Sequence, residues 1–471
     1  MPNISATQII ILGGGGDLSQ RKLLPALLDL FTRKKLPETF NIIGLARTPR
    51  TDEQYRQFVA EAIEAHCTNH NHTLQNVMDF CEHVSYVQGS FDDIDSYHRL
   101  NEAISNFDST NSIACNRLFY LAVPPKHYHQ IFSDLKTTGA ADESHGSWTH
   151  ILVEKPFGRD LETAQTLDTQ LASLYREDQI FRIDHYLAKE AVQNILSFRF
   201  ANTLLKVPWN KDSIESVHIN MSETIDVGHR ANFYEGVGAL RDVGQNHILQ
   251  LLALVAMREP DNFNTDSIRE ARCEVLQALK EIPTDEFEAS VLRGQYEDYQ
   301  KNDIVADDSQ TETYFELKAE LDLSEWKGVP FYLSAGKALD KEEVSIVVKF
   351  LDICSGMFVT NTCLSVGNKI TLTISPEQTI AITFNTKTPG LGFNLESQTL
   401  SFTCEKGDLD IKNAYEKVLY DSIIGDQTLF THTKEVLAAW KFITPIIEEW
   451  DKLPLHQYKK GTKGPAKSII K

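Results

Sequence analysis

The 471-residue chain lacks the usual signs of secretion, membrane insertion and nucleic-acid binding. Its seven cysteines are scattered and include no C-x-x-C pair, which indicates reduced thiols rather than a disulfide framework. The longest apolar run, Ile248 to Met257, is about half as long as a membrane span requires. The run at 8–12 is too short for a signal peptide. The net charge of −20 argues against a nucleic-acid or anionic-membrane partner. We therefore expect a cytoplasmic protein.

The remaining composition is that of a globular protein with more than one core. Hydrophobic residues make up 42% of the chain and charged residues 24%. At this length two domains are the natural division. Because the chain is acidic overall, an anionic substrate would have to be bound by local Lys, Arg and His side chains.

The N-terminal part alternates short apolar runs with helical patterns. Strands are expected at 8–12, 41–46, 84–88, 117–123 and 149–153, and helices at 52–66 and 92–106. Such alternation predicts a parallel sheet covered by helices on both faces, as in Rossmann-type α/β domains.

A glycine run stands between the first strand and the first helix. Gly13, Gly14, Gly15 and Gly16 are followed by Asp17 and Leu18, and Lys22 lies in the helix. Glycines in this position let the backbone approach a pyrophosphate, which the helix N-terminus then stabilises. Four glycines alone could be a flexible turn. The flanking strand and helix favour a dinucleotide site.

The second strand ends in Arg47 rather than in an acidic residue. An Asp or Glu there would bind the ribose 2′-hydroxyl of NAD, whereas Arg suits the 2′-phosphate of NADP. The alternative is an ordinary surface arginine. The interval between the glycines and Arg47 is longer than usual, so the first helix should be long.

Two further strand ends carry polar residues. The segment Leu121 to Tyr128 interrupts a strand with Pro124-Pro125, and Glu154-Lys155-Pro156-Phe157-Gly158 follows the strand at 149–153. A residue before proline is held extended, so the ammonium of Lys155 should point into the crevice at the carboxyl edge of the sheet.

The stretch from Arg182 to Glu190, R-I-D-H-Y-L-A-K-E, is expected to open a helix. In that helix His185 and Lys189 would stand at i and i+4 on one face, with Asp184 at the entrance. Cationic groups at a helix N-terminus would form a phosphate site. The alternative is a capped, solvated helix start.

The second half of the chain shows a different pattern of expected secondary structure. Its β-branched and alternating runs at 217–221, 344–350, 370–375, 379–384 and 399–403 follow one another with polar turns between them. Helices are expected at 241–257, 411–424 and 431–450, and the tail from Leu455 should be irregular. We predict an α/β Rossmann-type NADP-binding domain at 1–183 and, at 184–471, an α+β domain with a large, mainly antiparallel sheet for substrate binding and oligomerisation.

One helix carries a polar cluster. Asp242, Asn246 and His247 lie in the first turns of the otherwise apolar helix at 241–257. A lone histidine on such a helix is usually a core residue. As the alternative, imidazole has a pKa suited to a neutral general base.

Several of these strings together resemble one family. R-I-D-H-Y-L-A-K-E, R-D-V-G-Q-N-H-I-L-Q, the G-x-x-G-D-L loop and E-K-P-F-G resemble motifs of the glucose-6-phosphate dehydrogenases. The resemblance spans Gly13 to Pro465. The family usually has Gly at the position of Ala188, a Lys or Arg at that of Glu342 and a Gln at that of Ser375. The last two departures lie at the edge of the expected sugar-phosphate site.

The resemblance implies roles for individual residues. His247 would be the general base and Asp184 its orienting carboxylate. Substrate would be bound by Lys155, His185, Tyr186, Lys189, Glu223, Asp242 and Lys337, with His185, Tyr186, Lys189 and Lys337 at the 6-phosphate. The cofactor would be bound by Gly13 to Leu18, Lys22, Arg47, Tyr128, Glu154 and Lys155.

The implied activity is oxidation of glucose 6-phosphate at C1 to 6-phosphoglucono-1,5-lactone, the first step of the oxidative pentose phosphate pathway. NADP would be the cofactor and NAD a poorer alternative. The protein would form a homodimer or homotetramer. Two alternative functions are a dehydrogenase for a different sugar, since a wider group of sugar dehydrogenases shares the E-K-P motif, and an inactive NADP-binding scaffold.

No metal site is expected. His66, Cys67, His70, His72, Cys81 and His83 lie near one another in the sequence, but they lack the paired spacing of zinc ligands.

Overall fold

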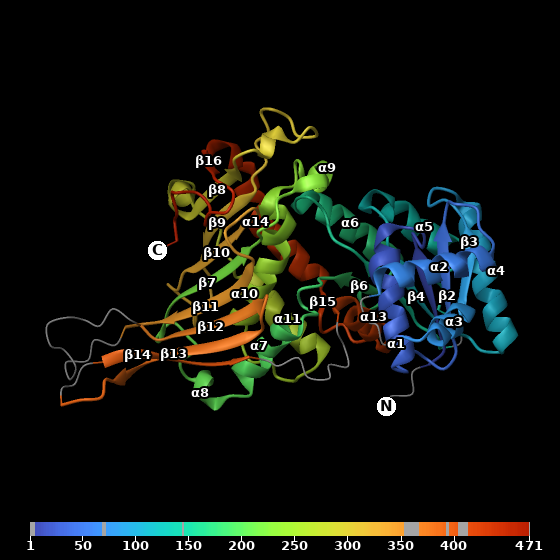
Figure 1. Cartoon of the computed structure of the whole chain (residues 1–471), viewed down its shortest axis with the longest axis horizontal. Coiled ribbons are helices and arrows are strands. Elements are labelled where there is room, and N and C mark those ends of the chain that lie inside the picture. The colour runs from blue at the N-terminus through green and yellow to red at the C-terminus, as the bar shows by residue number, and fades with distance from the viewer. Residues whose placement is uncertain are drawn as a thin grey trace.

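The protein is described by a computed structural model. The structure describes residues 5–67, 72–143, 146–352, 367–391, 395–403 and 413–470. Two twisted sheets lie side by side, the N-terminal sheet at one end of the molecule and a larger sheet at the other (Figure 1). Helices lie between and around them. No helix within the described ranges combines the length and hydrophobicity that a membrane crossing needs.

The N-terminal sheet is of the predicted Rossmann type. Its strands follow the order β15-β6-β5-β4-β1-β2-β3. Six are parallel to their neighbours, and β15 pairs with β6 in the antiparallel sense. The bounds are β1 Thr7–Leu12, β2 Phe40–Ala46, β3 Val84–Gln88, β4 Asn116–Leu121, β5 Thr149–Val153, β6 Ile180–Ile183 and β15 Phe430–Thr431. Every residue of β1 and β4 is buried, as expected for a parallel sheet covered on both faces.

Helices cover both faces of this sheet. They are η1 (Ser19–Leu23) continuing into α1 (Leu24–Thr32), α2 (Asp52–His66), α3 (Leu74–Glu82), α4 (Ile94–Asn111), α5 (Tyr128–Thr137) and α6 (Leu161–Leu174). Leu24 and Tyr55 belong to the core on one face, and Leu100 and Ile131 to the core on the other. Thr51 begins α2 with a capping box that pairs it with Gln54. The predicted long first helix is confirmed.

The larger sheet has the order β14-β13-β12-β11-β7-β10-β9-β8-β16. Among the described residues its neighbouring strands are antiparallel except for β7–β10 and β8–β16, which confirms a mainly antiparallel sheet. The bounds are β7 Ile214–Ser222, β8 Val291–Tyr296, β9 Tyr314–Ala319, β10 Phe331–Gly336, β11 Glu343–Phe350, β12 Lys369–Ser375, β13 Thr379–Lys387, β14 Leu395–Thr403 and β16 Leu455–Tyr458.

The tail was predicted to be irregular from Leu455. This is wrong for Leu455–Tyr458, which form β16 along the edge of β8, and residues 459–470 form no further helix or named strand. Tyr458 is buried there against Tyr296 and Tyr314. The short polar sequence carried no strand pattern, and its conformation depends on the edge that it covers.

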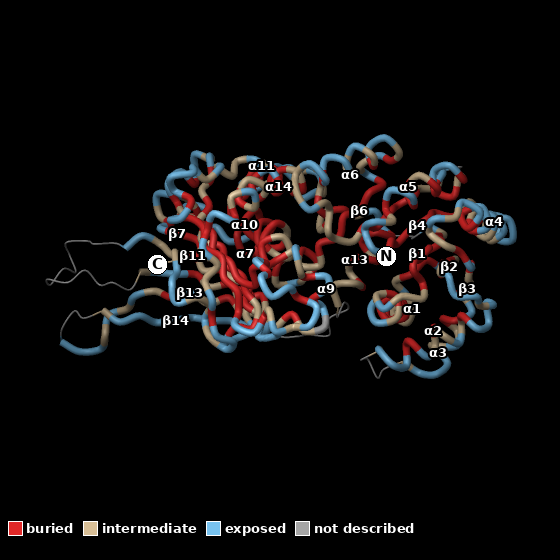
Figure 2. The backbone as a smooth tube through the Cα atoms, turned by 90° about the horizontal axis from the view of Figure 1, so that it is seen from above, coloured by how far each residue is buried: buried red, intermediate tan, exposed pale blue. Residues whose placement is uncertain are grey.

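Helices cover one face of the larger sheet and lie between the two sheets (Figure 1). They are α7 (Glu190–Phe200), η5 (Leu240–Ile248), α10 (Leu249–Ala256), α11 (Thr265–Gln277) and α14 (Thr433–Glu448), with short helices α8 (Thr203–Lys206), α9 (Ala231–Tyr234) and α12 (Phe287–Ser290). Their apolar faces form one core with the sheet, and β14 is exposed along nearly its whole length (Figure 2). The predicted helices at 241–257 and 431–450 are confirmed.

The C-terminal part returns to the N-terminal sheet. Helix α13 (Ala414–Ile424) contacts α1, and Phe430 and Thr431 of β15 pair with Ile183 and Arg182. The sheet is therefore completed by residues from far along the chain, and the division at 183/184 remains a prediction.

Candidate active site

The candidate site lies at the carboxyl edge of the N-terminal sheet, where η5 approaches it. Lys155 follows β5, Asp184 follows β6, and His247 lies in η5. Parallel strands bring their carboxyl ends to one edge, which is where open α/β sheets bind ligands. The fold thus joins three residues that are remote in sequence.

Asp184, His247 and Lys155 form a continuous array. His247 Nδ1 lies 2.7 Å from Asp184 Oδ1, and His247 Nε2 lies 2.8 Å from Lys155 Nζ. An ammonium can only donate, so Nε2 carries the lone pair and Nδ1 donates its hydrogen to Asp184. Lys155 also donates to the carbonyl of Asp242 at 3.0 Å. The imidazole therefore presents its basic nitrogen towards the lysine.

The electrostatics keep this imidazole neutral and its partner ionised. Burial lowers the pKa of His247; Asp184 opposes this effect and Lys155 adds to it. Burial alone would raise the pKa of Asp184, but its interaction with His247, together with the ammonium of Lys155, lowers it to about 2. A neutral base next to a carboxylate is suited to accepting a proton.

The segment from Asp184 to Lys189 is a turn, so the predicted helix start is wrong. Asp184 Oδ1 accepts the backbone N–H of Tyr186 at 2.9 Å, and its carbonyl accepts that of Leu187. Such local bonds compete with a helix, and α7 begins only at Glu190 with Lys189 as its N-cap. His185 and Lys189 therefore do not stand one helical turn apart.

Lys189 still reaches the site through an aromatic ring. Its Nζ lies 3.8 Å from the ring centroid of Tyr186, and that ring lies 4.3 Å from the ring of His247. Burial lowers the pKa of Lys189, while Asp184 and Glu342 oppose the shift. The ammonium is thus partly desolvated, which strengthens a contact with an anion.

His185 points to a different neighbourhood. Its Nε2 lies 3.2 Å from both carboxylate oxygens of Glu154, and its ring packs 4.2 Å from that of Tyr415. Tyr120 donates to Glu154 at 2.5 Å, and Tyr128 donates to the Glu154 carbonyl at 3.0 Å. Burial would raise the pKa of Glu154, but His185 and Tyr120 outweigh it and lower that pKa.

Tyr415 and Tyr120 are site residues that the sequence did not reveal. Tyr415 comes from α13, more than two hundred positions beyond His185, and no motif connects them. Tyr120 lies within an apolar strand pattern in which nothing distinguishes it from a core residue.

Lys337, Glu223 and Asp242 close the far side of the site. Glu223 follows β7 and Lys337 follows β10, and the parallel pairing of these strands places the two residues side by side. Lys337 forms an ion pair with Glu223, and its Nζ lies 3.9 Å from Asp242 Oδ2. The three side chains and Tyr234 line a small recess. Carboxylates here can accept hydrogen bonds from hydroxyl groups.

The glycine run lies at the end of β1. Gly13 has φ +95°, and a Cβ added there would lie 2.4 Å from the Ala122 carbonyl oxygen. A Cβ on Gly14 would lie 2.7 Å from Gly44 Cα. Both positions therefore require glycine. Asp17 and Lys22 are exposed at the helix start, and Leu18 is partly buried.

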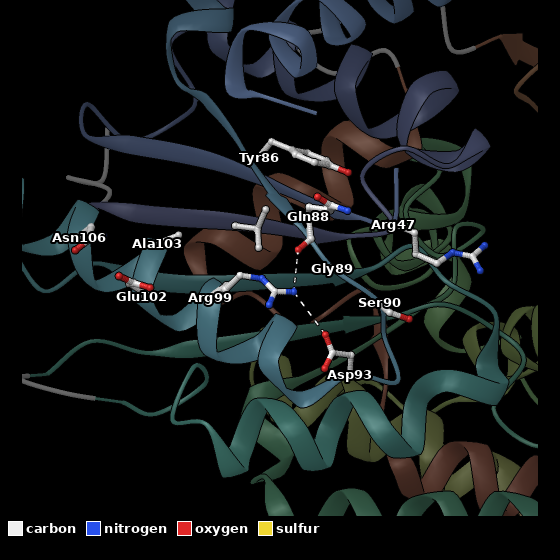
Figure 3. A pocket seen from close by; sticks show the side chains of 11 residues that line it. Arg47, Tyr86, Gln88, Gly89, Ser90, Asp93, Arg99, Glu102, Ala103 and Asn106 are labelled. Atoms are coloured by element: carbon white, nitrogen blue, oxygen red, sulfur yellow. Dashed lines mark hydrogen bonds and ion pairs between the residues drawn. The ribbon is translucent and has the colours of Figure 1, made fainter. Parts of the chain in front are cut away.

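Arg47 lines a cavity of about 760 Å³ at the ends of β2 and β3. Figure 3 shows Arg47 at one end of this cavity, near Gly89 and Ser90, whereas Arg99 is bonded to Gln88 and paired with Asp93. A glycine loop beside a cavity with an exposed arginine fits a dinucleotide that carries an extra phosphate.

The His and Cys residues that lie near one another in the sequence at 66–83 are mostly separated in the structure. Cys67 and His72 come together with Asp29, their possible ligand atoms lying within 4.8 Å of one another. Cys81 instead contacts the Arg56 carbonyl, and His83 stacks on Phe40. His66 is exposed, and His70 lies outside the described residues.

Comparisons with known proteins identify the same family in both halves. The family model "Glucose-6-phosphate dehydrogenase, NAD binding domain" matches residues 10–194, and "Glucose-6-phosphate dehydrogenase, C-terminal domain" matches residues 196–470. Glucose-6-phosphate 1-dehydrogenase of Bacillus subtilis is 36% identical, over 98% of this chain and 95% of that protein. A cytoplasmic glucose-6-phosphate 1-dehydrogenase of Arabidopsis thaliana is 37% identical, over 99% and 90%. A solved glucose-6-phosphate dehydrogenase in complex with glucose 6-phosphate has a TM-score of 0.90 at 33% identity, covering 99% of this chain and 97% of that one.

Proposed function

The chain belongs to the glucose-6-phosphate dehydrogenase family, and from this membership we propose that it oxidises C1 of glucose 6-phosphate to 6-phosphoglucono-1,5-lactone with NADP as the oxidant. The observation that supports this reaction best is the orientation of His247, whose unprotonated Nε2 faces Lys155 at 2.8 Å. Sugar oxidation needs such a base at the C1 hydroxyl.

His247 acts as the general base in this proposal. The O1 hydroxyl of the sugar would enter beside Lys155 and give its proton to His247 Nε2. Asp184 keeps Nδ1 protonated and stabilises the imidazolium that forms. Lys155 would then donate to O1 and hold it against the base. The nicotinamide, when bound, supplies the acceptor for the hydride that leaves C1.

The 6-phosphate would be bound by cations at the other end of the sugar. Lys189 and Lys337 provide ammonium groups, and Tyr186 provides the ring on which Lys189 rests. His185 would join them through Nδ1, a buried atom without a hydrogen-bond partner among the described residues. Charge-assisted hydrogen bonds of this type contribute on the order of 1.5–3 kcal/mol each.

Glu223 and Asp242 would accept hydrogen bonds from sugar hydroxyls. Both carboxylates already lie near Lys337, and the ion pairs fix their directions. The sugar would therefore be oriented by the same ion-pair cluster that holds its phosphate.

The cofactor would lie along the carboxyl edge of the N-terminal sheet. The proposed contacts are Gly13, Gly14, Gly15, Gly16, Asp17, Leu18, Lys22, Arg47, Tyr128, Glu154 and Lys155. The backbone at Gly13 and Gly14 leaves no room for side chains, as a pyrophosphate cradle requires. NAD would be a poorer alternative because it lacks the 2′-phosphate that Arg47 would bind.

We also propose a cytoplasmic homodimer or homotetramer without a nucleic-acid or membrane partner. The large sheet leaves apolar side chains exposed on β13 and β14, namely Ile382, Leu400 and Phe402. Exposed apolar groups on a sheet face favour pairing with a second copy.

The decisive experiment measures initial rates of NADPH formation with glucose 6-phosphate and with glucose, and repeats both with NAD. A strong preference for the phosphorylated sugar and NADP is expected. Equal rates with glucose would favour a dehydrogenase for another sugar, and no NADPH with any sugar would favour an inactive NADP-binding scaffold.

A further inference from the structure

Two arginines flank the carboxyl end of β2, and within the described ranges neither lies within ion-pair distance of a carboxylate. They are Arg47, directly after the strand, and Arg50, three positions later. Other arginines of this chain, such as Arg33, Arg182 and Arg272, are each paired with a carboxylate. In a chain with 66 acidic and 46 basic residues, two such arginines after one strand, next to the glycine run, are suited to an anion that comes from outside.

Arg50 lies over the glycine run. A Cβ added to Gly15 would be 3.3 Å from Arg50 Nη1 and 3.5 Å from Ala46 Cβ. The guanidinium therefore occupies the place that a side chain at Gly15 would take, on the side of the loop that faces the end of β2. This is the surface along which a bound dinucleotide passes.

The guanidinium is held in this place by aromatic residues. Its Cζ lies 4.2 Å from the ring centroid of Phe58 in α2. Burial raises the pKa of Tyr86 in β3, and the charge of Arg50 and a hydrogen bond between the two side chains oppose that shift. A cation–π contact positions Arg50 without neutralising its charge. The guanidinium donors that do not bond to Tyr86 stay available for a ligand.

We propose that Arg50 binds the 2′-phosphate of NADP together with Arg47 and is the second residue that sets the preference for NADP over NAD. This inference rests on the proposed function. The pyrophosphate belongs at the N-terminus of the helix that follows Gly16. Arg50 instead approaches from the side of β2 and α2, where the adenosine ribose lies in folds of this type. Arg50 therefore faces the one group that distinguishes the two cofactors.

The test compares cofactor use by Arg50→Met, Arg50→Lys and the unaltered enzyme. Methionine keeps an apolar side chain over Phe58 and removes the charge. Lysine restores the charge but lacks the planar guanidinium, which can bind a phosphate through two hydrogen bonds. With glucose 6-phosphate saturating, we expect Arg50→Met to lower kcat/KM for NADP about 10- to 100-fold and to leave kcat/KM for NAD within about twofold. Arg50→Lys should recover part of the loss.

Arg99→Ala is the charge-matched control. Arg99 lines the cavity that Arg47 also lines, but it is bonded to the Gln88 carbonyl and to Ser96 and lies 3.5 Å from Asp93. Its removal should leave the ratio of NADP to NAD efficiency unchanged. Melting temperatures of the variants show whether each still folds.

Direct binding separates this inference from the proposed function. By calorimetry, Arg50→Met should lose affinity for adenosine 2′,5′-bisphosphate but keep that for adenosine 5′-monophosphate. An unchanged ratio of NADP to NAD efficiency, or equal losses with both cofactors, would overturn the role of Arg50. Absence of sugar-dependent NADPH formation by the unaltered enzyme would overturn the proposed function, while the calorimetric result would still decide on Arg50.

Discussion

His247 and Asp184 are separated by 63 positions in the sequence, and yet Nδ1 of the imidazole lies 2.7 Å from Oδ1 of the carboxylate. Both side chains are almost fully buried. The contact fixes the tautomer, because the shared hydrogen must be on Nδ1 when Nε2 accepts from Lys155. This one relationship determines which nitrogen can act as a base.

The first prediction concerns the removal of that base. His247→Asn should lower kcat by about 10²–10⁴-fold, the usual contribution of a positioned general base, with little change in KM. Asp184→Asn should also lower kcat strongly, because an amide can donate to Nδ1 and stabilise the wrong tautomer. Steady-state kinetics with glucose 6-phosphate provide the test. A near-normal kcat in His247→Asn would remove the assignment.

The pH dependence of kcat follows from the state of His247. Burial lowers its pKa below the ordinary 6.5, and only the neutral imidazole can accept the proton. Activity should therefore persist at pH 6.5 and be lost as the pH falls through a lower value. Asp184, with a pKa of about 2, stays ionised throughout. The kcat profile is the proper measurement, because the second ionisation of the sugar phosphate, at about pH 6, also affects KM. An acidic limb above pH 6.5 would contradict this prediction.

The phosphate site is tested at Lys189. Lys189→Ala removes the ammonium that rests on Tyr186, and KM for glucose 6-phosphate should rise by roughly tenfold or more. The activity with glucose, which we expect to be much weaker, should hardly change, since glucose carries no phosphate. Lys206→Ala is a suitable control because this exposed lysine pairs with Glu259, which no proposed role involves. Equal losses with both sugars would refute the phosphate role.

Glu342 should weaken the binding of the same phosphate. It is exposed, and its charge acts on both Lys189 and Tyr186. A carboxylate in this position repels a phosphate through solvent, which costs at most about 1 kcal/mol. Glu342→Gln is therefore expected to lower KM for glucose 6-phosphate about two- to fivefold, and less at high salt. A rise in KM would show that Glu342 supports substrate binding instead.

Local patterns were sufficient for much of the fold. The apolar run at 8–12, the glycines after it and the helix that follows all form as predicted, because each depends on nearby residues. The contact between Asp184 and His247 was expected from the family resemblance, and the edge of the sheet brings the two residues together. Strand order along the larger sheet has no such local signature.

The differences arise where distant residues decide the conformation. The turn at 184–189 replaces a helix because Asp184 uses one oxygen for both Tyr186 and His247. Leu455 to Tyr458 becomes a strand because β8 offers an edge. Tyr415 reaches His185 only because α13 folds back onto the N-terminal part. Apart from Tyr186, which is two positions from Asp184, these partners are not visible in the local sequence.

The last prediction concerns the independence of the N-terminal part. Residues 1–183 alone leave the edge of β6 and one face of α1 uncovered, since β15 and α13 are missing. Phe430 is buried there, with its ring 4.8 Å from that of Phe181, and Glu416 pairs with Arg33 at 2.8 Å. Burying one phenylalanine contributes about 1.5–3 kcal/mol, a large share of a domain's stability.

The fragment 1–183 should therefore melt without cooperativity, whereas the same fragment joined by a flexible linker to residues 413–431 should unfold cooperatively. Circular dichroism melts compare the two, and a third fragment with Phe430→Ala should lie between them. If 1–183 alone unfolds as sharply and at the same temperature as the joined form, the returning segment does not stabilise the domain. The sheet would then be complete without β15, and the boundary at 183/184 would mark an independent folding unit.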